Sequence, residues 1–357
     1  MPELPEVETI ARDLRGLVTG ARVRGAGVGW AATVRSHSPE GFGAAVAGRQ
    51  IEGVGRRGKQ LLIWLSPARG SAAGPRAEPA VMTIHLKMTG QLFVVPAATP
   101  SDRHVHLVLS LTDGREIRFR DIRKFGRVGL YPRDMATGEP LPGAADGVLA
   151  RGAEPLADDF TAGRLASLLA GRRGRLKTLL MNQDFVAGVG NIYADESLWR
   201  ARLHPLRAAS TLRPADARTL HSALREVLAE AVERRGSSVD DYTAPEGDGS
   251  MQDHLRVYQR AGEPCPRCGH PIRRIVVGGR ATHYCPRCQR LPAGHRLPAS
   301  ALAAGPAPVR RGPRWTELSG RGALGRTGQE EERARRAEAR HKAAASRRAA
   351  ARAGGEA

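Results

Sequence analysis

Cysteine is scarce in this chain of 357 residues, and long apolar runs are missing altogether. No stretch approaches the ~20 apolar residues that a membrane span requires, and no basic segment followed by an apolar one stands at the N-terminus. We therefore expect neither a membrane role nor export, and we predict a cytoplasmic protein. The four cysteines all lie between residues 265 and 288. In an intracellular chain, such clustering indicates a metal site rather than disulfides.

Acidic residues are outnumbered, since 56 Lys and Arg face 36 Asp and Glu, which leaves a formal net charge of +20. An excess of this size indicates a polyanionic partner. Residues 290–357 contribute +9 of it, from 15 basic against 6 acidic residues, and they are rich in Ala, Gly and Pro. We find no core-forming pattern there and predict a disordered basic tail. The first 289 residues still carry +11, so the folded part is basic in its own right.

The apolar pattern changes its period along the chain. Residues 4–17 repeat at helical spacing, and period-two alternation follows in several stretches up to about residue 131. Alternation with Gly-rich turns predicts an antiparallel sandwich or barrel. From about residue 158 the period is helical again, and the longest helix is expected over residues 214–235. Residues 66–80 contain no core-forming pattern and are expected to form a loop.

Two cysteine pairs form the clearest metal motif. Cys265 and Cys268 enclose Pro-Arg, as do Cys285 and Cys288, and 16 residues separate the pairs. Thiolate pairs at this interval close a tetrahedral Zn²⁺ site, and four protein ligands leave no open position, so the zinc is expected to be structural. An iron–sulfur cluster or a redox pair is the alternative. The basic hairpin between the pairs, which includes Arg280, is typical of zinc hairpins that lie against nucleic acid, although many charge runs are only solvated.

The N-terminus provides a nucleophile if Met1 is removed, which the small Pro2 permits. The free secondary amine of Pro2 would titrate near pH ~8, so about a tenth of it is neutral at pH 7. A neutral amine attacks an electrophilic carbon and forms an iminium with an aldehyde, and the neighbouring Glu3 is placed to move the protons. A structural interpretation competes, in which Pro5 begins a helix whose N-terminal end favours the early acidic residues.

Three further segments have features of nucleic-acid contacts. Asn191 follows a Gly-Val-Gly segment and is expected to open a helix whose N-terminus binds an anion such as phosphate, or simply to cap that helix. Phe125 lies two positions after Arg123 at a turn, and Met88 lies at another turn. Apolar side chains at such turns can wedge between base pairs. Ordinary packing is the alternative for both.

Together these pieces resemble the bacterial formamidopyrimidine-DNA glycosylase family over about residues 1–289. The resemblance rests on six segments in the family's order: the Pro-Glu-Leu-Pro-Glu-Val-Glu-Thr start, Arg56-Arg57-Gly58-Lys59, His85-Leu86-Lys87-Met88, Arg123-Lys124-Phe125-Gly126, the Gly-Val-Gly-Asn-Ile-Tyr-Ala segment, and the four-cysteine zinc finger. The family fold is α+β, with an N-terminal antiparallel β-sandwich flanked by helices, then a helical domain with a helix–two-turn–helix motif and a zinc finger. The predicted parts are then a catalytic β-sandwich domain (1–131), a linker (132–157), a helix–two-turn–helix DNA-binding domain (158–260), a zinc finger (261–289) and the disordered basic tail (290–357).

The resemblance also implies an activity. It indicates a bifunctional DNA glycosylase and abasic-site lyase of base excision repair, which removes 8-oxoguanine and formamidopyrimidines and nicks the strand by β,δ-elimination. The implied catalytic residues are Pro2 as the nucleophile at C1′, Glu3 as acid and base, Lys59 as proton donor, and Arg280 at a phosphate. The implied DNA contacts are Met88, Arg123 and Phe125, which fill the gap left by the flipped nucleotide, and His104, Lys177 and Asn191. The implied cofactor is one structural Zn²⁺, and the implied partner is duplex DNA with oxidised bases, bound by a monomer at the nucleoid.

Three departures from the family pattern affect affinity or substrate preference rather than the reaction. Lys87 stands where glycine is more familiar, the 66–80 loop is longer than the usual hairpin, and the tail lies outside the pattern. We expect the tail to add sequence-independent phosphate contacts. The nearest alternative is the endonuclease VIII-like branch, which prefers oxidised pyrimidines, but the N-terminal motif and the wedge residues favour the purine branch. A second alternative is a catalytically inactive zinc-finger DNA-binding protein, and the presence of the nucleophile with both of its partners argues against it.

Overall fold

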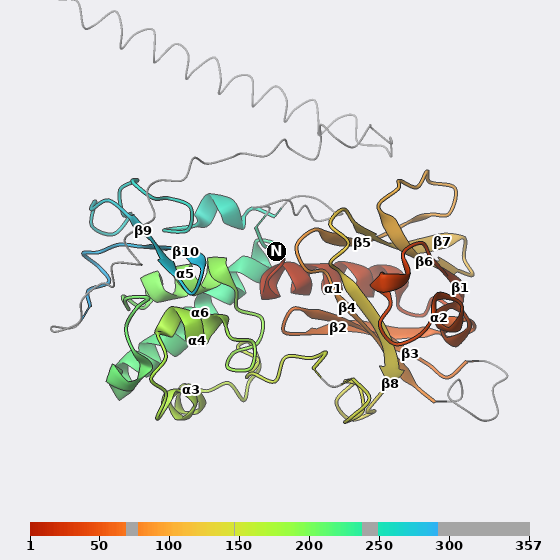
Figure 1. Cartoon of the computed structure of the whole chain (residues 1–357), viewed down its shortest axis with the longest axis horizontal. Coiled ribbons are helices and arrows are strands. Elements are labelled where there is room, and N and C mark those ends of the chain that lie inside the picture. Colours follow the sequence, from red (N-terminus) through yellow and green to blue (C-terminus); the bar gives the residue numbers. More distant parts are fainter. Residues whose placement is uncertain (69–77, 146, 238–248, 292–357) are drawn as a thin grey trace, which may run out of the picture. The chain divides into compact units, whose positions relative to one another are not determined.

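The structure is a computed structural model, and it describes residues 1–68, 78–145, 147–237 and 249–291 (Figure 1). Most of the predicted 66–80 loop and nearly all of the predicted 290–357 tail lie outside these residues, so the expectations for both stay predictions. Among the described residues, no helix is long and apolar enough to cross a membrane.

The first helix forms where the apolar spacing predicted it. Helix α1 spans Leu4–Val18 and buries one face of apolar side chains, including Val7, Ile10 and Leu14. Its N-terminus is closed by a capping box. The Glu3 side chain accepts from the Glu6 backbone N–H, and the Glu6 side chain accepts from the Glu3 backbone N–H. The structural interpretation of the early acidic residues is therefore confirmed, and it does not exclude a chemical role for the same carboxylates.

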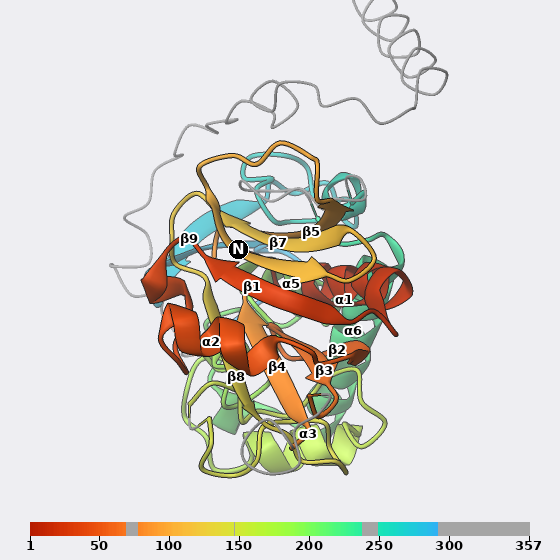
Figure 2. The ribbon, with the colours of Figure 1, turned by 90° about the vertical axis from the view of Figure 1, so that its right-hand side faces the viewer.

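Two antiparallel four-stranded sheets follow, as the period-two alternation predicted. One has the order β1-β6-β7-β5 and the other β2-β3-β4-β8, and Figure 2 shows them as two layers. Their strands are β1 (Val23–Val28), β2 (Ile51–Arg57), β3 (Gln60–Leu65), β4 (Ala80–His85), β5 (Gly90–Pro96), β6 (Val105–Leu111), β7 (Arg115–Asp121) and β8 (Arg127–Pro132). Both sheets contribute to one apolar core, which α1 and helix α2 (Pro39–Val46) join. The β-sandwich of the prediction is therefore confirmed.

The second half of the described chain is helical and ends in a small hairpin. Its elements are α3 (Ala162–Leu169), α4 (Leu176–Met181), α5 (Asn191–Arg200), α6 (Pro214–Glu233), and strands β9 (Arg273–Val277) and β10 (Arg280–Tyr284). The helices share a second apolar core, and Leu4 of α1 belongs to it. The Leu4 backbone N–H also donates to the Gly188 carbonyl at 3.0 Å. The N-terminus of the chain is thus held against the segment that opens α5.

Candidate active site and nucleic-acid interface

The carboxylate of Glu3 occupies the N-terminus of helix α5. It accepts backbone hydrogen bonds from Gly190 (2.8 Å), Ile192 (2.9 Å) and Tyr193 (3.3 Å). These N–H groups have no partner within the helix, and the helix dipole favours a negative charge at this end. We expected the Gly-Val-Gly-Asn segment to bind an anion such as phosphate. The anion in the structure is the chain's own Glu3.

Glycine at position 190 is required by this close approach. A Cβ added to Gly190 would lie 2.4 Å from the carboxyl carbon of Glu3, far inside ordinary contact distance. Glu3 itself is 3% exposed, and Pro2 before it is also buried. The predicted nucleophile and its carboxylate partner therefore lie together beneath the surface, at the point where α1 meets α5.

A second carboxylate, Glu6, lies behind Glu3. It accepts hydrogen bonds from the Glu3 backbone N–H (2.8 Å), the Tyr193 hydroxyl (2.5 Å) and the Ser237 backbone N–H (2.8 Å). Burial raises the pKa of Glu6, and the nearby charge of Glu3 raises it further. Burial and Glu6 together hold the pKa of Tyr193 well above its usual value. Glu6 and Tyr193 both hold Glu3, since Glu6 accepts from the Glu3 backbone N–H and the Tyr193 backbone N–H donates to the Glu3 carboxylate.

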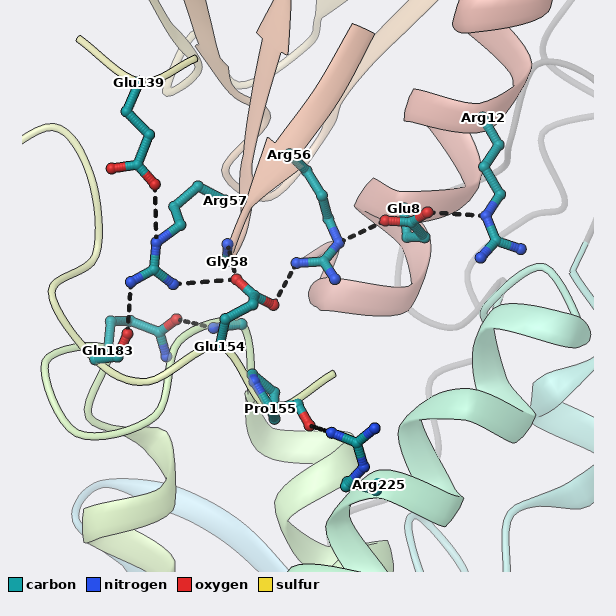
Figure 3. Close-up of polar contacts among 12 residues, drawn as sticks. Glu8, Arg12, Arg56, Arg57, Gly58, Glu139, Glu154, Pro155, Gln183 and Arg225 are labelled. Carbon is teal, nitrogen blue, oxygen red and sulfur yellow. Dashed lines mark hydrogen bonds and ion pairs between the residues drawn. The ribbon is translucent and has the colours of Figure 1, made fainter. Parts of the chain in front are cut away.

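Lys59 lies in the tight turn between β2 and β3, and an ionic network holds that turn (Figure 3). The carboxylate of Glu154 accepts from the Gly58 backbone N–H at 2.9 Å and from the guanidinium groups of Arg56 and Arg57 at 2.5 and 3.1 Å. Arg56 also binds Glu8 of α1 at 2.8 Å. Glu154 follows the segment that joins the sandwich to the helices, so a single carboxylate fixes the backbone directly before Lys59.

The pKa of Lys59 depends on charged residues at the N-terminus of the chain and on the β9–β10 hairpin. Lys59 is 6% exposed, and burial lowers its pKa from the ordinary value. The charges of Glu3 and Glu6 oppose that shift, whereas Arg280 on the β9–β10 hairpin adds to it. The structure therefore brings Glu3, Glu6 and Arg280 within electrostatic reach of Lys59. A lysine with a lowered pKa gives up its proton more readily at neutral pH than an ordinary lysine.

The predicted wedge residues come from two turns that one carboxylate joins. Asp121 accepts from the Thr89 hydroxyl next to Met88, and also from the backbone N–H groups of Arg123 and Gly126. Met88 is 38% exposed and Phe125 is 45% exposed. The guanidinium of Arg123 lies 4.9 Å from the centre of the Phe125 ring. The alternative of ordinary packing fails for Met88 and Phe125, because both side chains point out of the core.

His104 lies beside these turns, and Lys177 and Asn191 lie elsewhere. The His104 carbonyl accepts from the Asp121 backbone N–H at 2.9 Å. Lys177 is fully buried, and its Nζ lies 2.6 Å from Asp195 and 2.8 Å from the Asn191 carbonyl. A direct contact of Lys177 with DNA would require this pair to open, so that role stays a prediction. The buried side-chain oxygen of Asn191 has no hydrogen-bond partner among the described residues.

Four cysteines converge at the base of the β9–β10 hairpin. Their sulfur atoms all lie within 4.8 Å of one another, with Cys268 and Cys285 at 3.5 Å and Cys265 and Cys288 at 4.0 Å. A Zn²⁺ ion with four sulfurs at ~2.3 Å holds them about 3.8 Å apart, so the sulfur set fits a tetrahedral zinc. Trp199 donates its indole N–H to the Cys265 sulfur at 3.5 Å.

The family models that match this chain cover both halves of the molecule. The formamidopyrimidine-DNA glycosylase N-terminal domain matches residues 1–128, the H2TH domain of that glycosylase matches 151–243, and the zinc finger found in FPG and IleRS matches 262–291. The formamidopyrimidine-DNA glycosylase of Roseiflexus sp. (strain RS-1) is 46% identical over 292 residues, which cover 81% of this chain and 100% of that protein. The chain belongs to the formamidopyrimidine-DNA glycosylase family. A member from Bacillus subtilis (strain 168) is 40% identical and is covered to 99%, against 81% of this chain.

Solved structures of the glycosylase family have the same fold. The complex of Lactococcus lactis Fpg with abasic-site DNA matches with a TM-score of 0.69 at 32% identity, covering 81% of this chain and 100% of that one. MutM (FPG) from Thermus thermophilus matches with a TM-score of 0.67 at 42% identity, covering 81% and 98%. MutM bound to DNA containing carbocyclic 8-oxo-G matches with a TM-score of 0.69 at 33% identity, covering 81% and 100%. Membership of this family and the sulfur geometry agree on one structural zinc, held by the four cysteines.

Sequence reasoning missed several supporting residues of this glycosylase fold. Glu6 was visible as the second half of a capping box, because it stands three residues after Glu3. Tyr193 follows two positions after the Gly-Val-Gly-Asn segment but carries no local signal for a contact with Glu6. Asp121 and Glu154 had no signal either, since Asp121 binds the hydroxyl of Thr89, 32 residues earlier, and Glu154 binds the backbone of Gly58, 96 residues earlier.

Proposed function

We propose that this family member removes oxidised purines, namely 8-oxoguanine and formamidopyrimidines, from duplex DNA and then cleaves the abasic strand. The observation that carries the proposal is the buried Glu3 carboxylate at the N-terminus of α5, which directly follows Pro2 in the chain and lies within electrostatic reach of the buried Lys59. Family membership supports it, because the similar proteins are named as formamidopyrimidine-DNA glycosylases. The solved relatives include complexes with abasic-site DNA and with 8-oxo-G DNA. A protein with this activity works on chromosomal DNA, so its place of action is the nucleoid.

The first chemical step uses the Pro2 amine after Met1 is lost. The amine nitrogen attacks C1′ of the damaged nucleotide, the bond between C1′ and the base breaks, and the base leaves with a proton. Opening of the sugar ring then gives an iminium between Pro2 and C1′, with the proton going to the ring oxygen. The damaged nucleotide must leave the base stack first, because C1′ is inaccessible within it.

Glu3 and Lys59 supply the proton transfers of this scheme. The carboxylate of Glu3 is oriented by three backbone N–H groups, and it takes the proton released by the Pro2 amine. Lys59, whose pKa burial lowers, donates to the departing group and contacts the lesion phosphate. The iminium acts as an electron sink, so loss of a C2′ proton expels the 3′ phosphate by β-elimination. A second elimination releases the 5′ phosphate.

Binding of the damaged duplex uses the exposed residues of both turns and the zinc hairpin. Met88, Arg123 and Phe125 fill the gap left by the flipped nucleotide, and Arg123 faces the unpaired base. Filling that gap offsets part of the unstacking cost, on the order of a few kcal/mol. Asn191 and Arg280 hold phosphates around the lesion, and His104 and Lys177 complete the set. The proposed domain limits are those expected from the sequence, with catalysis assigned to residues 1–131.

Borohydride trapping on single-lesion duplexes tests this function. Duplexes with one 8-oxoguanine, one formamidopyrimidine or one oxidised pyrimidine are incubated with the protein and borohydride. We expect covalent complexes and nicked product, with the purine lesions processed faster. Faster processing of the pyrimidine lesion would indicate the endonuclease VIII-like alternative, and the lack of any covalent complex would indicate a binding protein without catalysis.

A further inference from the structure

An exposed tryptophan lies beside the turn that carries Phe125. Trp30 is 41% exposed and directly precedes the short helical turn Ala31–Thr33. The Nζ of Lys124 lies 4.1 Å from the centre of its ring, so an ammonium group sits on the aromatic face. Trp30 belongs to none of the apolar clusters of the described residues, and its exposed part is available to a ligand.

Trp30 is presented from a rigid base rather than from a loose loop. The Gly29 backbone N–H donates to the His106 carbonyl at 2.9 Å, which ties the preceding residue to strand β6. The Arg35 backbone N–H donates to the Val128 carbonyl at 2.9 Å, which ties the following segment to strand β8. An aromatic side chain on an anchored backbone loses little conformational freedom when it contacts a ligand.

The turn Arg123–Gly126, which carries Phe125, therefore makes two contacts of the same kind, each between a cationic side chain and an aromatic ring. In one contact the guanidinium of Arg123 lies over the Phe125 ring, and in the other the ammonium of Lys124 lies over the Trp30 ring. Lys124 has a φ of +57°, in the left-handed region that non-glycine residues rarely adopt. Strain at such a position is found mainly at functional sites.

The surroundings of Trp30 carry positive charge without acidic partners. Arg127 donates to the carbonyls of Lys124 and Gly126 at 3.1 and 2.7 Å. Burial lowers the pKa of Arg127 and the charge of Arg35 lowers it further, while the charge of Asp121 opposes these shifts. In the part of the chain that the structure describes, none of Arg35, Arg127 and Lys124 forms an ion pair. The nearby carboxylate of Asp121 is occupied by backbone N–H groups and a hydroxyl. Cations without an ion-pair partner, next to an exposed aromatic ring, are the composition of a surface that binds nucleic acid.

We propose that Trp30 packs against the sugar and base edge of the DNA strand opposite the lesion, while Lys124 and Arg35 bind phosphates of that strand. This rests on the proposed function, in which Arg123 faces the unpaired base. Lys124 follows Arg123 at one Cα spacing of about 3.8 Å, so the nearest backbone is that of the strand carrying the unpaired base. The contact would hold the undamaged strand while Met88 and Phe125 fill the gap.

Binding to a duplex with a tetrahydrofuran abasic analogue, which the protein cannot process, tests the role of the ring. Trp30→Ala should lose about fivefold to tenfold in affinity, in the range of one aromatic–base contact, and Trp30→Phe should keep most of it. Wild-type tryptophan fluorescence should be quenched on binding, and that part of the quenching should be lost in Trp30→Phe. The matched control is Leu141→Ala, whose side chain is equally exposed at 41% and should bind like the wild type.

The strand assignment needs a second measurement. Single phosphates are replaced by neutral methylphosphonates, first on one strand and then on the other. The wild type should lose affinity when phosphates of the strand opposite the lesion are replaced. The Lys124→Asn variant, in which asparagine tolerates the left-handed backbone, should no longer respond to these replacements. Its slope of log affinity against log salt should be smaller by ~0.9. Wild-type affinity of Trp30→Ala, or sensitivity confined to the lesion strand, would overturn the inference. A wild type that cannot be trapped with borohydride would instead count against the proposed function.

Discussion

Replacing Gly190 with Ala should displace the Glu3 carboxylate and slow base excision, while the protein stays folded. The added Cβ would lie 2.4 Å from the Glu3 carboxyl carbon and 2.5 Å from its Oε1. Ordinary contact begins at 3.4 Å, so the carboxylate must retreat by about 1 Å, and the close packing around a side chain that is only 3% exposed resists that movement. The change therefore acts directly on the carboxylate that we assign to proton transfer.

The magnitude follows from the three hydrogen bonds that Glu3 accepts from α5. Each hydrogen bond to a charged group contributes roughly 1.5–3 kcal/mol, and a 1 Å retreat breaks one or two of them. We expect the free energy of unfolding to fall by about 3 kcal/mol, which leaves a domain of ordinary stability folded. A displacement of this size at a reacting group slows the reaction by about 100-fold.

Urea unfolding and the single-turnover rate of base excision measure the two effects. The control is Gly16→Ala in the last turn of α1, where an added Cβ meets nothing within 4 Å. Gly16→Ala should stabilise the protein by about 0.5–1 kcal/mol and leave the rate unchanged. If Gly190→Ala excises the base at the wild-type rate, the oriented Glu3 carboxylate is not part of the chemistry and our reasoning is wrong.

Three other predictions follow from the same geometry. The rate of excision should decline at alkaline pH with a midpoint below 10.5, because a proton donor must be protonated and burial lowers the pKa of Lys59 from that value. Arg280→Gln should move the midpoint up and Glu6→Gln should move it down, because Arg280 lowers this pKa and Glu6 raises it. Shifts in the same direction would refute the assignment of Lys59 as proton donor. Chelation or Cys268→Ser should remove one zinc and weaken binding to abasic duplex by about tenfold or more, because the hairpin loses its anchor; unchanged affinity of a zinc-free protein by metal analysis would contradict this. Lys87→Gly should raise the free energy of unfolding by about 0.5–1 kcal/mol in a denaturant titration, since Lys87 has a φ of +56°, and a lower value would show that the side chain stabilises the fold.

The spacing of apolar residues was sufficient to predict the helices and strands of this fold, because burial of one face gives each kind of element its own apolar repeat. The helical repeat in residues 4–17 became α1, and the run expected over 214–235 became α6, Pro214–Glu233. The zinc ligands were equally predictable, since the spacing of two cysteine pairs is a local property. The sulfur atoms do converge within 4.8 Å.

The supporting contacts of the site could not be predicted in this way. Asn191 does open a helix, but the anion at its N-terminus is Glu3, which lies 187 residues before Gly190. The family resemblance implies Lys177 as a DNA contact, and no pattern in the sequence predicts that its amine pairs with Asp195 in the core. The first contact depends on how the N-terminal helix packs on the helical half, and the second on how α4 packs against α5. Local pattern carries no information about such packing.

The central claim is that the amine of Pro2 forms the bond to DNA, and mapping the trapped adduct tests it most directly. The protein is reduced with borohydride on an abasic duplex, digested with trypsin and nuclease, and the modified peptide is sequenced by mass spectrometry. We predict that the sugar remnant is on the nitrogen of Pro2, in a peptide that lacks Met1. A remnant on Lys59 or another lysine, with Pro2 unmodified, would contradict the account.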